Sequence, residues 1–143
     1  MRLRFAAVTV LVLLLTSCGR LKELPTDPGN GGGDPIDLTA TFTRVKAEVL
    51  PTCAAVGCHG TIGAQDNLVL APAVAYANTV GVASVENSSL HRVAPNDPAN
   101  SYLYRKITGT GITGERMPLG GPYLSDAQIK LVRDWIRRGA PND

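Results

Sequence analysis

Four segments of the chain have apolar residues at helical spacing, and these segments are predicted to be its helices. They are residues 39–50, 71–80, 98–107 and 125–138. Pro51 should end the first helix, Gly81 the second and Gly109 the third. The loops between them are rich in Gly and Pro, and none alternates apolar and polar residues as a strand does. The pattern predicts an all-α fold of about four helices with long loops.

The best-marked helix is the last one. Ser125 and Gln128 have the spacing of a capping box, which satisfies free amide groups at a helix N-terminus. Gly139 follows the predicted end, where glycine is the preferred residue. The apolar residues of this helix fall on one face, which should bury against the rest of the domain, and they are Ile129, Val132, Trp135 and Ile136.

The first 17 residues have the pattern of an export signal. Arg2 and Arg4 precede an apolar stretch, residues 5–15, that is too short to span a bilayer. The sequence Leu15-Thr16-Ser17-Cys18 resembles the lipobox of bacterial lipoproteins, which implies cleavage before Cys18 and attachment of lipid to its thiol. The alternative is an ordinary secretory signal in which Cys18 has no role. Either way we expect the chain to leave the cytoplasm. With lipid at Cys18 it would be a periplasmic or outer-surface lipoprotein, anchored in a membrane of the cell envelope.

Residues 18–37 are predicted to be a flexible linker, because they contain three prolines and the run Gly31-Gly32-Gly33. Residues 38–143 then form one small domain. Removing Arg2 and Arg4 leaves 12 basic residues from 14, against 12 acidic ones, so the mature chain is formally neutral. Nucleic-acid binding needs a basic surface, so this balance argues against it.

Cys53 and Cys58, followed directly by His59, suggest the chemistry of the domain. Two cysteines with an adjacent histidine attach a c-type haem, although the usual spacer is two residues and here it is four. Two alternatives remain open. Two cysteines of an exported protein also form a disulfide, and two cysteines with His59 and His91 make a weaker zinc set.

A bound haem needs a sixth iron ligand, and Met117 is the only methionine outside the predicted signal. A thioether favours ferrous iron and raises the reduction potential. The alternative role for Met117 is to fill a gap in the core, but it lies in a polar, Gly-rich loop. His91 could replace Met117 as a ligand, although a lone histidine beside Arg92 is more often a surface residue.

Apolar and aromatic residues elsewhere are candidates for the haem pocket, or else for ordinary core. They are Leu68, Val69, Leu70, Tyr76, Tyr102, Tyr104 and Leu119. Arg92, Arg105 and Arg116 are candidate partners of the haem propionates, although a solvated charge is the commoner role of a single arginine.

These motifs, together with Val93–Pro98 and the last helix, resemble the small monohaem cytochrome c-like domains of exported bacterial proteins. The resemblance extends from Phe42 to the C-terminus. It implies a class I cytochrome c fold around one haem, with Cys53 and Cys58 as covalent attachments. It also implies His59 and Met117 as axial ligands, and first and last helices that cross and pack.

The resulting hypothesis is a membrane-tethered, monomeric one-electron carrier between exported redox partner proteins. We find no nucleophile–base pair or carboxylate dyad, so we do not expect an enzyme. The alternative is a haem-free, disulfide-stapled surface lipoprotein that binds protein or carbohydrate. A haem sensor with an open sixth position is a third possibility, and it would require that Met117 is not a ligand.

Overall fold

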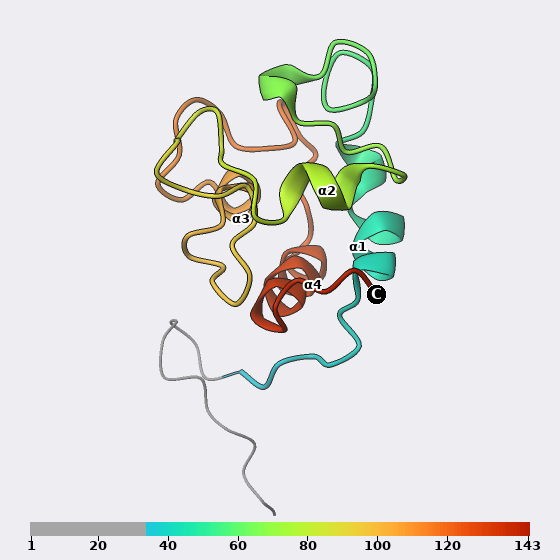
Figure 1. The fold of residues 1–143 in the computed structure, drawn as a ribbon, viewed down its shortest axis with the longest axis vertical. Helices are drawn as coiled ribbons and strands as arrows, with labels where there is room; N and C mark the ends of the chain where they lie inside the picture. The colour runs from blue at the N-terminus through green and yellow to red at the C-terminus, as the bar shows by residue number, and fades with distance from the viewer. Residues whose placement is uncertain (1–33) are drawn as a thin grey trace, which may run out of the picture.

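The computed structural model describes residues 34–143, and this part of the chain is helical (Figure 1). The α-helices are α1 (Phe42–Glu48), α2 (Ala75–Thr79), α3 (Tyr102–Thr108) and α4 (Asp126–Arg137), and the short 3-10 helices are η1 (Leu50–Thr52) and η2 (Gln65–Asn67). Within residues 34–143 there are isolated β-bridges but no strand. The all-α prediction is therefore confirmed. No helix in this part of the chain has the length and apolar character needed to cross a membrane.

The predicted signal segment, Cys18 and most of the predicted linker lie outside the described residues. The predicted helices are all present, but the first three are shorter than expected. The first begins at Phe42, where the Thr41 side chain accepts a hydrogen bond from the Arg44 amide. Pro51 lies in the first turn of η1, which tolerates a residue without an amide hydrogen. The second helix begins only at Ala75, because residues 72–74 form a turn.

The C-terminus of α3 and both ends of α4 match the prediction closely, although α3 begins at Tyr102, four residues after its predicted start. Gly109 caps α3 in the left-handed conformation, with φ of 79°. Ser125 and Gln128 form the predicted capping box at the start of α4. Gly139 has φ of 94° after the end of α4, which explains why glycine stands there.

The core lies where α1 packs against α4, as predicted for the first and last helices. The Phe42 ring stacks on Trp135 with a centroid distance of 5.2 Å and meets Tyr76 edge-on at 5.3 Å. Val132 and Ile136 are fully buried beside them. The C-terminus closes this end of the domain, because the Trp135 indole donates to the Pro141 carbonyl oxygen at 2.9 Å.

A buried carboxylate fastens the start of the domain to α4. Asp134 is fully buried and bonds to Lys130 and Arg133 of its own helix. It also accepts a hydrogen bond from the Asp37 amide at 3.2 Å. The chain thus enters beside α4, and the loop between η1 and η2 lies at the opposite end of the molecule (Figure 1).

Candidate functional site

A cavity of about 530 Å³ lies at the end of the domain where the long loops are. Its walls come from segments far apart in the sequence: the η1–η2 loop, α3, and the loop between α3 and α4. Its lining is mainly apolar, with several charged groups at one end. Sites for cofactors of moderate size are typically cavities of roughly 300–1,000 Å³ with such a lining. Cys53, Cys58, His59 and Met117 all line this cavity.

The four residues between the cysteines form a tight loop that returns His59 to the start of the motif. The His59 amide donates to the Cys53 carbonyl oxygen at 3.1 Å, and the Gly60 amide donates to that of Ala55 at 2.9 Å. A Cβ on Gly60 would lie 2.9 Å from the carbonyl oxygens of both Ala54 and Ala55, so this position requires glycine. The longer spacer is therefore accommodated within a compact, hydrogen-bonded loop.

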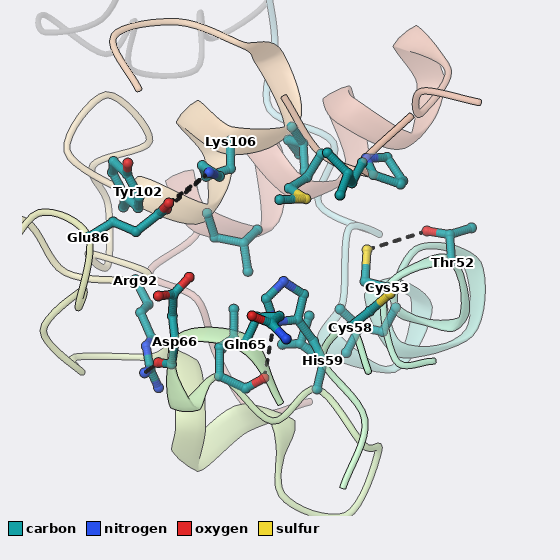
Figure 2. Close-up of a pocket in the computed structure, with 18 of the residues that line it drawn as sticks. Thr52, Cys53, Cys58, His59, Gln65, Asp66, Glu86, Arg92, Tyr102 and Lys106 are labelled. Atoms are coloured by element: carbon teal, nitrogen blue, oxygen red, sulfur yellow. Dashed lines mark hydrogen bonds and ion pairs between the residues drawn. The ribbon is translucent and has the colours of Figure 1, made fainter. Parts of the chain in front are cut away.

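Both thiols are free in the structure, and no disulfide joins Cys53 to Cys58. Cys58 is exposed, whereas Cys53 is half-buried and its sulfur lies 3.4 Å from the Thr52 hydroxyl oxygen. Burial raises the pKa of the Cys53 thiol, although the Thr52 hydroxyl opposes this in part. Figure 2 shows both sulfurs at one side of the cavity, next to His59.

The His59 ring is oriented by a hydrogen bond on one of its nitrogens. Nδ1 lies 3.2 Å from the Leu68 carbonyl oxygen. When Nδ1 donates this bond, the proton is on Nδ1 and the lone pair of Nε2 is available to a metal. The Leu70 amide also donates to the His59 carbonyl oxygen at 2.7 Å, so the backbone at Leu70 is held against the backbone at His59.

Met117 reaches the same cavity from the loop that follows α3. Its amide donates to the Lys106 carbonyl oxygen at 2.9 Å, which fastens the loop to the end of that helix. Figure 2 shows Lys106, whose carbonyl oxygen accepts this hydrogen bond, across the cavity from His59. The structure thus places His59 and Met117, which are 58 positions apart in the sequence, on the wall of one cavity.

The other predicted pocket residues divide into two groups. Leu68, Leu70, Tyr102 and Leu119 line the cavity. Val69, Tyr76 and Tyr104 do not, although Tyr76 and Tyr104 pack against the core. The Tyr76 hydroxyl donates to the Ala140 carbonyl oxygen at 3.0 Å, which directs this side chain to the core end beside Phe42.

Of the three candidate arginines, only Arg92 lines the cavity. It is buried, and its guanidinium donates to the carbonyl oxygens of Asp66 and Asn78 at 2.8 and 2.9 Å. Burial lowers the pKa of Arg92, while Asp66 partly compensates. Arg105 and Arg116 do not line the cavity, and they donate instead to the backbone carbonyl oxygens of Ala99 and Ile107.

Sequence reasoning missed much of the wall formed by α3. Leu103, Lys106 and Ile107 line the cavity beside Tyr102, and the spacing of these four residues on one helical face was the available signal. It also missed the ion pair between Lys106 and Glu86, with 3.0 Å between Nζ and Oε2, which no local pattern indicates.

The zinc alternative finds no support among residues 34–143. His91 is exposed and does not line the cavity, and this part of the chain contains no group of three or more His, Cys, Asp or Glu side chains placed to hold a metal. Comparison with known proteins found no matching family, no similar curated protein and no similar solved structure.

Proposed function

We propose that this protein is a monohaem c-type cytochrome that carries single electrons, with a class I cytochrome c-like fold. One observation supports this above all: a single cavity is lined by two free thiols, an imidazole oriented through Nδ1 and the thioether of Met117. These groups are the donor set of a covalently attached haem with His/Met ligation. The volume and apolar lining of the cavity also fit a group of this kind.

Each residue then has a distinct role. Cys53 and Cys58 would hold the haem through thioether bonds, and His59 and Met117 would hold its iron. The haem, when bound, supplies one-electron transfer. Leu68, Leu70, Leu103 and Ile107 would exclude water from it, and a low-polarity surrounding is one determinant of the reduction potential.

The tether belongs to the same proposal. The lipobox-like sequence ending at Cys18 supports attachment to a membrane of the cell envelope, and the linker would leave the domain within reach of exported redox partners. The haem-free, disulfide-stapled alternative would need Cys53 and Cys58 to bond to each other. A disulfide alone would leave the oriented imidazole of His59 and the thioether of Met117 on the cavity wall without a role.

The test is an absorption spectrum of the protein made in a host with cytochrome c maturation factors, followed by a haem stain of the denatured chain on a gel. We expect sharp bands on reduction and haem that stays on the denatured chain. Cys58→Ala should reduce the covalent attachment. Met117→Ala should leave the haem attached but lower the reduction potential, by on the order of 0.1 V within the roughly 0.8 V that axial ligands span.

A folded protein without haem, in which mass spectrometry finds a Cys53–Cys58 disulfide, would contradict the proposal and support the alternative. An unchanged potential and spin state in Met117→Ala would contradict the assignment of Met117 alone.

A further inference from the structure

The loop that contains Met117 has little structure of its own. Residues 109–125 join α3 to α4 without a helix or strand. The main chain of Met117 makes one hydrogen bond to α3, from its amide to the Lys106 carbonyl oxygen. A loop of this kind moves unless side chains hold it, so the position of the Met117 sulfur depends on its neighbours.

Arg116 links this loop to α3 on one side. Its Nε donates to the Ile107 carbonyl oxygen at 2.8 Å. Ile107 lies in the last turn of α3, where carbonyl oxygens have no partner within the helix. A guanidinium donor makes this hydrogen bond stronger than one between neutral groups. The aliphatic part of Arg116 also packs on Gly109, since a Cβ there would lie 3.2 Å from Arg116 Cδ.

The same side chain also holds the returning part of the loop. The guanidinium carbon of Arg116 lies 4.3 Å from the ring centroid of Tyr123, a cation–π distance. Arg116 therefore joins the end of α3 to the segment beyond Met117, and Met117 lies in the chain between these two contacts. Arg116 itself does not line the cavity.

We propose that Arg116 is a positioning residue that holds Met117 against the cavity wall. The part of this proposal that concerns iron ligation by Met117 rests on the function proposed above. Without Arg116, Met117 keeps its hydrogen bond to Lys106 but loses the link to Ile107 and Tyr123. The loop then opens more often, and a competing ligand gains access to the sixth position in proportion to the open fraction.

The first test measures imidazole binding to the ferric, haem-loaded protein. We expect Arg116→Ala to bind imidazole about tenfold more tightly than the wild type. This factor corresponds to the free energy that one hydrogen bond from a charged donor contributes to the closed loop. Met117→Ala should bind it more tightly still. The matched control is Arg105→Ala, because Arg105 lies on α3 and bonds to the Ala99 carbonyl oxygen away from the cavity. It should bind imidazole as the wild type does, and Arg116→Lys, which lacks the planar group, should fall between.

The second test needs no haem. In the haem-free full chain we expect hydrogen exchange at the Met117 amide to accelerate about tenfold in Arg116→Ala but not in Arg105→Ala. Exchange at Val132, in the core, should stay unchanged in both. Two results would overturn the proposal. One is an unaltered rate of hydrogen exchange at the Met117 amide in Arg116→Ala. The other is a wild-type imidazole affinity in Arg116→Ala, while Met117→Ala binds imidazole more tightly. Faster exchange at Met117 in a protein that never takes up haem would support the role of Arg116 and refute the proposed function.

Discussion

The two ends of this domain are built in different ways. At the end where α1 packs on α4, side chains from Phe42, Val132 and Trp135 fill the interior, and each is at most 2% exposed. At the other end, the loops around Cys58 and Met117 surround a cavity of about 530 Å³. We call these the core end and the cavity end.

The difference separates the residues that fill a packed core from the residues that line a cavity. Protein interiors are close-packed, and voids larger than a water molecule are few. Because the core end is fully packed, the cavity at the other end is not explained by poor packing throughout the domain. The space at the cavity end, with two thiols and an oriented imidazole on its wall, is better explained as the site of a large ligand.

The largest effect should follow from removing the central side chain of the core end. Trp135→Ala deletes the stack on Phe42 and the hydrogen bond to the Pro141 carbonyl oxygen. We expect it to lower the free energy of unfolding of the haem-free protein by about 3–5 kcal/mol, measured by urea titration. Val85→Ala, at an exposed position on the cavity wall, should change it by less than about 0.5 kcal/mol. Equal losses in the two variants would remove the distinction between the ends.

A second prediction concerns the buried carboxylate of the core end. Burial alone would raise the pKa of Asp134, but hydrogen bonds from Lys130, the Asp37 amide and Arg133 together lower it below its usual value. Its contribution to stability is therefore present above about pH 4, the pKa of an unfolded aspartate, and is lost as the pH falls through the lower folded value.

Asp134→Asn tests this contribution. At pH 7 we expect a loss of about 3 kcal/mol, because charged donors around a buried site lose their acceptor. Urea titrations between pH 7 and pH 2 should show the wild type and the variant converging at acid pH. A constant difference over this range would mean that the Asp134 charge contributes nothing and only its shape matters.

The features of the fold and the site that can be predicted from the sequence are those set by residues close to each other in the chain. The C-terminus of α3 and both ends of α4 follow from residues within a few positions of each other, such as Ser125 with Gln128, and the sequence predicts them well. The Cys53–His59 motif is equally local. The predicted helix lengths are less accurate, since a turn at residues 72–74 delays the start of α2 to Ala75.

Contacts between distant segments were beyond local reasoning. Apolar spacing could not tell that Tyr76 faces Phe42 and Ala140 while Tyr102 faces the cavity, because both are aromatic residues on short helices. The three arginines looked equivalent in sequence, and only the fold distinguishes buried Arg92 from Arg116 beside Tyr123. The Lys106–Glu86 pair likewise joins residues 20 positions apart.

The smallest effect is expected for Leu103→Ala. It is best compared with Leu131→Ala, because the two substitutions remove the same atoms from the two ends of the domain. Leu131 is buried in the core, whereas Leu103 is partly buried and lines the cavity. Leu131→Ala creates a new void in a packed interior, so we expect it to cost about 2–5 kcal/mol. In the haem-free protein Leu103 already faces open space, so Leu103→Ala should cost only about 1 kcal/mol, the value of the lost apolar contacts on one side.

Haem should abolish this difference. A bound porphyrin would cover Leu103, and the cost of Leu103→Ala would then rise toward that of Leu131→Ala, while the cost of Leu131→Ala would stay as it was. Urea titrations of both variants, with and without haem, measure all four values. A cost for Leu103→Ala that is the same in the two forms would mean that the ligand of the cavity end does not contact α3, and the comparison between the two ends would then no longer support a haem site.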